Sequence, residues 1–370
     1  MPSVCDYRTM GQQDWSDVGD RVQAARTAAG MSQGELADAI GLDRTMVAKI
    51  ESGARRVDAL ELARLAATLR VPMAHFLEAQ PVVLSRRAVA LTNDTDSEAG
   101  RESNLLDVAL EGWIRELRQL IGLGLLTPGR ILAYPSPVAS ADDARRAARW
   151  LRDKLGAGSE PVDSLVRLCQ QAGQYVLVTE LRGDGASAVD GDLGAAVVSS
   201  KGDPGRRRAT AAHELGHLVL GDEYSSDIGV HASRAEREAI IDAFAAEVLL
   251  PIATFPGADR SGAVSRDQLL HLAATYRTSW SLTIKQAEAA GLDVPKRWAR
   301  TNPTKAEFLE ALGWTPQPDL ESVRVPPAFA HAVMQAWRTG RITRRRAVEL
   351  MHGQIQEGDL PPEAEADLAP

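Results

Sequence analysis

The residues best suited to chemistry are His213, Glu214 and His217, which form an H-E-x-x-H sequence within the run RATAAHELGHLVL. On a helix, residues four apart share one face, so both imidazoles can reach a single metal ion. Glu214 lies beside them, where its carboxylate can reach a water molecule on that ion. Two imidazoles, an open coordination position and a carboxylate base are the arrangement of a zinc-dependent peptidase.

A catalytic zinc ion needs a third protein ligand besides water, and a second apolar helix offers one. The run EAIIDAFAAEVLLP places Glu238 and Asp242 on one helical face. We expect Glu238 to complete a site for one Zn²⁺ and Asp242 to accept the second N–H of a ligating histidine. Glu247 lies about two and a half turns beyond Glu238 at roughly 3.6 residues per turn, so it faces away and is not expected to bind.

The oxyanion of a tetrahedral intermediate needs a further donor, and the sequence does not select one. The candidates for an oxyanion or substrate contact are Tyr224, His231 and His271. Two alternatives to a catalytic zinc site carry less weight. A structural zinc site would favour cysteine ligands, and Cys169 belongs to an amphipathic helix, where a core position is expected instead of a nucleophile.

The elements that must position these residues are several helices and a small sheet. Apolar periodicity predicts helices over 141–155, 162–171, 206–220, 234–250 and 265–276. Strands are expected at 175–181 and 195–200, separated by a Gly- and Asp-rich hairpin loop.

The two runs quoted above resemble the ImmA/IrrE family of bacterial metallopeptidases over about residues 141–293. The resemblance implies a compact α+β fold of the gluzincin type. It also implies that His213, His217 and Glu238 are the zinc ligands and that Glu214 is the general base. One departure is Ile241-Asp242, where many relatives have Ala-Asn; the aspartate is consistent with an intact site.

A second set of candidate residues lies in 14–80, where five short helical segments follow one another. Ser32 and Glu35 form a capping box for a helix over 33–40, and Asp43 is expected to cap another over 44–52. The turn between these two helices contains Gly41, as in a helix-turn-helix. The run MSQGELADAIGLDRTMVAKIESGARR, with LELARLAATLRVPMAHFLE after it, resembles the XRE/Cro-repressor family.

That resemblance places the recognition helix, which enters the major groove, at 44–52. The predicted DNA-contacting residues are Gln33, Arg44, Thr45, Met46, Lys49, Arg55 and Arg56. Arg44 and Lys49 are groove or phosphate candidates, whereas Arg55 and Arg56 are phosphate candidates. Residues 14–80 carry ten acids and eight bases, so a helical protein-interaction domain of the same shape is the alternative.

The length of 370 residues suits two to three domains at about 150 residues each. We expect a mainly α protein with an all-α helix-turn-helix domain, a linker helix, an α+β gluzincin-like domain and a helical C-terminal region. The predicted boundaries are a disordered tail at 1–13, the DNA-binding domain at 14–80, an acidic linker and amphipathic helix at 81–139, the zinc peptidase domain at 140–300, a helical region at 301–353 and an acidic disordered tail at 354–370.

The formal net charge of −8 does not exclude DNA. The linker Thr92–Ser103 carries a charge of −3 and the tail Gly353–Pro370 a charge of −5, which leaves the rest of the chain neutral. DNA binding would then rest on a local basic cluster, with modest nonspecific affinity. Two cysteines, no signal peptide and no run of roughly 18 apolar residues favour a cytoplasmic protein without a membrane partner.

These features predict a bacterial transcriptional regulator that combines sequence-specific binding of double-stranded operator DNA with zinc-dependent proteolysis. The family resemblance implies that the substrate is a repressor or antitoxin-type protein, cleaved by a zinc-bound water that Glu214 activates. The alternative is a DNA-binding regulator or antitoxin-like protein whose metallopeptidase domain acts as a sensor or binding module without turnover. Paired half-sites favour a homodimer, with the helix at 104–126 as a candidate interface.

Overall fold

A computed structural model describes residues 15–69, 71–77, 82–87, 98–201, 203–221, 231–255, 264–316 and 324–361 of the chain. The predicted tail at 1–13 lies outside these residues. The protein is mainly α-helical, as predicted, and none of the helices in the described ranges is long and apolar enough to cross a membrane. The chain divides into two compact units. The first comprises 1–81 and 88–112, and the second comprises 82–87 and 113–370.

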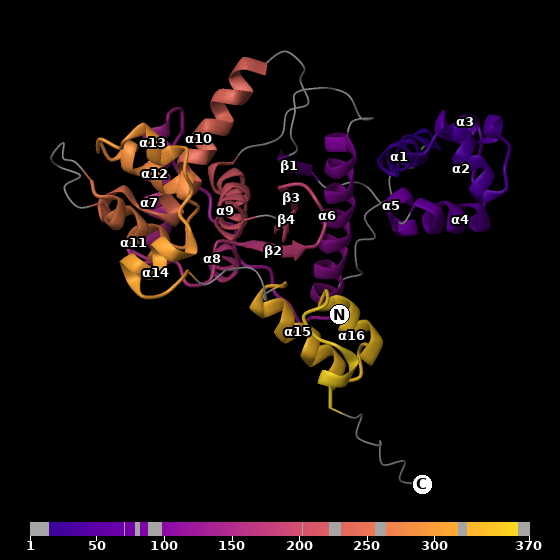
Figure 1. The fold of residues 1–370 in the computed structure, drawn as a ribbon. Helices are drawn as coiled ribbons and strands as arrows, with labels where there is room; N and C mark the ends of the chain where they lie inside the picture. The colour runs from indigo at the N-terminus through magenta and orange to yellow at the C-terminus, as the bar shows by residue number, and fades with distance from the viewer. Residues whose placement is uncertain are drawn as a thin grey trace, which may run out of the picture. The chain divides into compact units, whose positions relative to one another are not determined.

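The first unit contains the five predicted short helices (Figure 1). They are α1 (Trp15–Ala28), α2 (Gln33–Ile40), α3 (Arg44–Glu51), α4 (Ala59–Leu69) and α5 (Met73–Leu77). The predicted capping box at Ser32 and Glu35 is present, and Gly41 ends α2 with a φ of 72°, a left-handed conformation that favours glycine. Asp43 occupies the N-cap position of α3, but its side chain makes no cap hydrogen bond, so that part of the prediction was wrong. Apolar side chains from these helices, among them Leu36, Val47 and Phe76, form the core of the unit.

Helix α6 (Glu98–Gly122) begins earlier than the predicted helix at 104–126. Its first turns fall in the stretch 92–103, which we expected to be an irregular linker. Glu98, Ala99 and Arg101 are good helix formers, so the largely polar composition of this stretch does not prevent a helix. The helix ends at Gly122, before the predicted end at 126.

The second unit is built around a four-stranded sheet of order β1-β3-β4-β2. The strands are β1 (Val82–Arg87), β2 (Gln174–Thr179), β3 (Gly185–Asp190) and β4 (Leu193–Ser199). β2 and β4 are parallel, whereas β3 is antiparallel to both β4 and β1.

Two of these strands, β1 and β3, are not predicted from the sequence. β3 lies in the stretch we expected to be a hairpin loop, and β1 lies in the predicted linker of 81–139. The β3 sequence GASAVD is mostly small residues with weak strand preference, so its conformation depends on pairing with β4 and β1.

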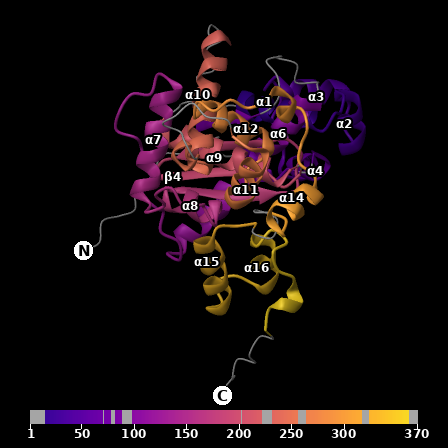
Figure 2. The same cartoon turned by 60° about the vertical axis from the view of Figure 1, so that its left-hand side comes forward.

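Four helices pack with the sheet into the main core of the second unit. They are α7 (Ala141–Lys154), α8 (Leu165–Gln171), α9 (Pro204–Leu220) and α10 (His231–Leu249). α9 contacts all four strands (Figure 1), and α7 packs beside α10 (Figure 2). α9 begins two residues before the predicted start because Asp203 caps it and Pro204 occupies its first turn.

The remaining helices form two further groups. η1 (Ile252–Thr254), α11 (Arg266–Tyr276), α12 (Trp280–Ala289), α13 (Lys296–Ala299) and α14 (Lys305–Leu312) surround a second core. α15 (Pro327–Arg338) and α16 (Arg344–Leu350) pack side by side (Figure 2) and precede η2 (Glu357–Asp359). Residues 354–361 belong to the predicted disordered tail but are structured, because the Arg344 guanidinium donates to the carbonyls of Glu357 and Leu360.

Candidate metal centre and DNA-binding helix

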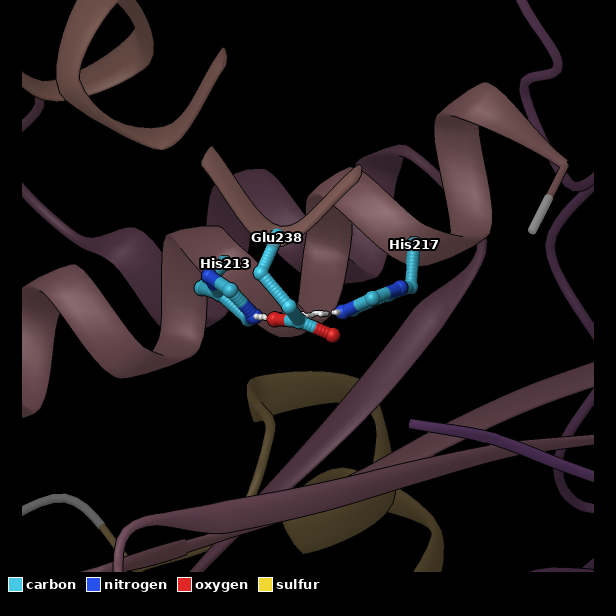
Figure 3. Close-up of side chains that lie close together, drawn as sticks. All are labelled: His213, His217 and Glu238. Atoms are coloured by element: carbon cyan, nitrogen blue, oxygen red, sulfur yellow. Dashed lines mark hydrogen bonds and ion pairs between the residues drawn. The ribbon is translucent and has the colours of Figure 1, made fainter. Parts of the chain in front are cut away.

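Helices α9 and α10 bring the three predicted zinc ligands together (Figure 3). His213 and His217 are almost fully buried on α9, and Glu238 on α10 extends its carboxylate to them. His213 Nε2 lies 3.1 Å from Glu238 Oε2, and the two Nε2 atoms lie 3.1 Å apart. The three ligand atoms all lie within 4.8 Å of one another, which is compact enough for one ion to contact them all.

Gly216 permits this approach of α10 to α9. A Cβ atom at Gly216 would lie 2.9 Å from Ile241 Cγ2 and 3.0 Å from Phe244 Cδ1. Both distances are shorter than ordinary carbon contacts, and both neighbouring side chains are fully buried. A glycine between the two histidines therefore lets the helices cross closely enough for Glu238 to reach His213.

Asp242 orients the first histidine of the cluster. The Nδ1–H of His213 donates to Asp242 Oδ1 over 2.8 Å, which leaves Nε2 directed at Glu238 and His217. A carboxylate on the outer ring nitrogen fixes the tautomer that a metal ligand needs. The donor set of two imidazole nitrogens and one carboxylate, with the outer nitrogen already engaged, fits Zn²⁺.

Glu214 lies in a fully buried position between α9 and the sheet. Its Oε2 accepts a hydrogen bond of 2.7 Å from Ser187 Oγ on β3. Its Oε1 has no hydrogen-bond partner among the described residues. A buried carboxylate oxygen without a donor is costly, so Oε1 is the oxygen of Glu214 that is available to a further hydrogen-bond donor.

The β3 residues beside Glu214 are small for a geometric reason. A Cβ atom at Gly185 would lie 2.8 Å from Thr210 Cγ2, 3.0 Å from the Val197 carbonyl oxygen and 3.2 Å from Glu214 Oε1. Glycine therefore lets β3 lie against α9 without displacing the carboxylate. Ser187 is not predicted as a site residue from the sequence, because only its position in a strand beside the H-E-x-x-H helix brings it to Glu214.

Glu238 is poised to be charged. Burial raises the pKa of its carboxyl, but the hydrogen bond with His213 and the interactions with His217 and His213 outweigh that effect and lower the pKa below its usual value. An ionised carboxylate is the form that binds a metal ion.

The remaining sequence candidates for an oxyanion or substrate contact are Tyr224, His231 and His271. Tyr224 lies outside the described residues, and the side chain of His231, at the start of α10, is also outside them. His271 is exposed on α11 and is not one of the clustered residues. Glu247, which we did not expect to bind metal, is fully buried, and its carboxylate accepts from Arg149 and Gln286. Burial raises the pKa of Cys169 to about 12, as befits a core thiol and not a nucleophile.

A cavity of about 950 Å³ adjoins the metal-centre side of α10. Its lining includes Asp242, Arg206, Arg277, Trp280 and Lys285, but none of the three clustered ligands. The cavity is therefore a neighbour of the orienting carboxylate and is not itself the metal centre.

In the first unit, α3 presents the predicted DNA-contacting residues. Arg44, Thr45, Met46 and Lys49 are all exposed on this helix, and Arg56 is exposed just beyond it. Val47 and Ile50, on the opposite face, are buried in the core. The helix thus offers one polar, partly basic face, as a recognition helix requires.

Two other predicted DNA contacts have partners inside the unit. Gln33 Nε2 donates to Glu51 Oε2 over 2.8 Å, and Arg26 also binds this buried carboxylate. Arg55 forms a bidentate ion pair with Glu61, at 2.9 and 2.6 Å. Both side chains would have to share or exchange these partners in order to contact a phosphate.

Two family models match the chain. Residues 22–76 match the helix-turn-helix family, and residues 194–285 match the IrrE N-terminal-like domain. The second match spans β4, α9, α10, α11 and most of α12, and so includes all three clustered ligands and Glu214.

Two curated proteins are similar to this chain over a short region. Uncharacterized HTH-type transcriptional regulators of Sinorhizobium medicae and Rhizobium meliloti are each 38% identical over 64 residues, which is 17% of this chain. The matched region spans 46% of those curated relatives, about half their length. The crystal structure of Bacillus thuringiensis PlcR with the peptide PapR7 and DNA covers 90% of this chain and 79% of its own at 12% identity, but its TM-score of 0.18 supports no statement about fold.

The structure and the two family matches agree on how the chain is organised. The helix-turn-helix match coincides with the compact bundle that presents α3, which supports DNA binding by the first unit. The IrrE-like match coincides with the helices that hold the His-His-Glu cluster. The chain therefore joins an XRE-type helix-turn-helix domain of transcriptional regulators to an ImmA/IrrE-type domain of the M78 peptidase family.

Proposed function

We propose that this protein is a bacterial transcriptional regulator that binds operator DNA through α3 and cleaves a repressor or antitoxin-type protein at a zinc site. The observation that carries the peptidase part is the juxtaposition of His213, His217 and Glu238 with the buried base Glu214. A structural zinc site would need neither an adjacent carboxylate nor an unpartnered oxygen on it.

The chain's own residues divide the work of peptide hydrolysis. When bound by His213, His217 and Glu238, zinc would supply a Lewis acid that polarises a peptide carbonyl and eases the deprotonation of water. Glu214 Oε1 accepts the proton of the attacking water and later delivers it to the leaving amine. Ser187 holds the other oxygen of Glu214, and Asp242 holds the imidazole of His213.

Metal content tests the site without any substrate. The purified protein should contain about one zinc ion, as expected of a single three-ligand site. Glu238→Gln should lose most of it, because an amide is a poor zinc ligand. Glu236→Gln is the matched control, since Glu236 is an exposed carboxylate on the same helix. Equal zinc content in the two variants would contradict the ligand assignment.

Glu214→Gln separates the peptidase from a sensor. This variant should retain zinc and DNA binding but lose cleavage of a repressor encoded beside the gene, because glutamine cannot accept the proton. If Glu214→Gln supports the full regulatory response in cells, the domain acts as a sensor or binding module without turnover.

Electrophoretic mobility shifts with the protein's own promoter test the DNA part. Arg44→Ala should weaken binding and alter the sequence preference, whereas Arg56→Ala should weaken binding uniformly and reduce its salt dependence. Arg167→Ala, an exposed arginine on α8, is the control and should bind as the wild type does. Identical binding by all three variants would favour a protein-interaction role for the first unit.

A further inference from the structure

The sheet edge beside the metal centre is covered by a segment that comes from far away in the sequence. β1 belongs to the second unit, whereas the described helices before and after it along the chain, α5 and α6 as far as Gly112, group with the first unit. It pairs with β3, about a hundred residues later, and ends the order β1-β3-β4-β2. Among the described strands, β3 would be the edge of the sheet if β1 left.

In the register of the sheet, β1 pairs with the β3 residues that lie beside Glu214. Gly185 and Ser187 are the two β3 residues that adjoin the Glu214 carboxylate. Their partners on β1 are Arg87 and Ser85. β1 also contacts α9, the helix that carries Glu214. The backbone of β1 therefore runs about one strand spacing, roughly 4.8 Å, from the strand that touches the catalytic carboxylate.

An exposed strand edge binds extended peptides through its main-chain groups, with little dependence on sequence. A peptidase whose base lies beside such an edge can use it to hold the substrate extended. From these contacts we infer that β1 is a built-in occupant of this edge, which excludes substrate peptides until it is displaced. The inference rests on the proposed peptidase function, and it names an extended polypeptide as the partner of the β3 edge.

The pairing itself is suited to release. The register between β1 and β3 shifts between Val83 and Ser85, so the ladder contains a bulge within a strand of only six residues. A bulge leaves one residue unpaired and weakens the local ladder. The covalent connection nevertheless gives β1 an effective concentration in the millimolar range. A free peptide at micromolar concentration should therefore compete poorly while β1 is in place.

The test weakens β1 through its backbone. Successive residues of a strand direct their N–H groups to opposite sides, so Ser85→Pro with Arg86→Pro removes one N–H that faces β3. Ser85→Ala with Arg86→Ala is the matched control, because it changes the same side chains and keeps both N–H groups. A third variant replaces residues 82–87 by Gly-Ser-Gly-Ser-Gly-Ser and serves if the double proline protein does not fold.

Peptide binding is measured on the full chain without metal, so the result does not depend on turnover. The probe is a fluorescein-labelled peptide of residues 80–89, QPVVLSRRAV, followed by fluorescence anisotropy. The double proline variant should bind this peptide at least tenfold more tightly than the wild type and the double alanine control. Equal affinity for all three proteins overturns the inference.

Cleavage of β-casein by the zinc-loaded proteins gives the second measurement. The double proline variant should cleave faster than the wild type, and the added peptide should inhibit it. If the wild type cleaves and the variant is slower, β1 is a structural strand and the inference is wrong. If the variant binds the peptide tightly but no zinc-loaded protein cleaves β-casein, β1 remains an occupant of a peptide-binding edge, and the repressor assay with Glu214→Gln decides the peptidase proposal.

Hydrogen exchange on the wild type needs no variant. The amides of β3 that face β1 should be protected in the wild type, although less strongly than those of the inner strand β4, and they should lose protection in the double proline variant. Rapid exchange of these β3 amides in the wild type would mean that β1 does not hold the edge, and would overturn the inference.

Discussion

Gly216→Ala offers a direct test of how the close crossing of α9 and α10 builds the metal centre. The new Cβ would stand 2.9 Å from Ile241 Cγ2, which is about 0.5 Å short of an ordinary contact of at least 3.4 Å. Overpacking of this kind costs about 1–3 kcal/mol. Within a helix, alanine is more favourable than glycine by about 1 kcal/mol. We therefore expect a net loss of unfolding free energy between roughly zero and 2 kcal/mol.

The same substitution should affect zinc more than it affects stability. α10 must move by several tenths of an ångström, and metal ligands need placement to within about 0.5 Å. The zinc affinity should fall by about tenfold or more, comparable to the loss of an outer hydrogen-bond partner.

The assays are urea unfolding of the metal-free protein and zinc competition with a chromophoric chelator. Gly122→Ala is the control, because nothing lies within 4 Å of its Cβ, and it should be neutral or slightly stabilising. If Gly216→Ala matches Gly122→Ala in both assays, the close crossing does not position Glu238 and this reasoning fails.

Three further predictions concern single contacts. Asp242→Asn should weaken zinc binding by about 10- to 100-fold in the chelator assay, because the amide no longer fixes the His213 tautomer as a carboxylate does; an unchanged affinity would contradict that role. The hydrogen bonds from Arg55 lower the pKa of Glu61 below 4.5. Their stabilisation of the first unit is therefore present above pH 4.5 and lost as the pH falls through the lowered pKa. In thermal melts, the melting temperature of Arg55→Met should fall less on acidification than that of the wild type. Cys169 should react with a thiol reagent only after unfolding, since its side chain is fully buried; rapid labelling of the native protein would argue against the core packing.

The sequence predicts the helical parts of the metal centre well because their signals are local. His213 and His217 lie within one turn of an apolar helix, and Glu238 lies on the next helix with the same periodicity. Helical spacing determines which side chains share a face, so the ligands can be chosen without knowledge of the fold. Their meeting across the two helices is what the structure adds, together with Gly216 as its cause.

The strands are less predictable because their conformation depends on distant partners. β3 is made largely of glycine, alanine and serine, and β1 is separated from it by about a hundred residues. No local pattern links the two segments. Ser187 is therefore invisible as a partner of Glu214 until the sheet is assembled against α9. Similarly, the ion pair of Arg55 with Glu61 depends on how the chain turns after α3.

The long sequence separation between β1 and β3 also has a consequence for protein synthesis. Helices α1–α5 are complete by Leu77, whereas the last metal ligand, Glu238, is made about 160 residues later. At roughly 5–20 residues per second, this interval lasts roughly 8–30 s. The nascent chain can therefore fold a DNA-binding bundle from local contacts well before its peptidase site exists. β1 emerges from the ribosome ahead of β3, so the strand that covers the edge is already present when that edge forms.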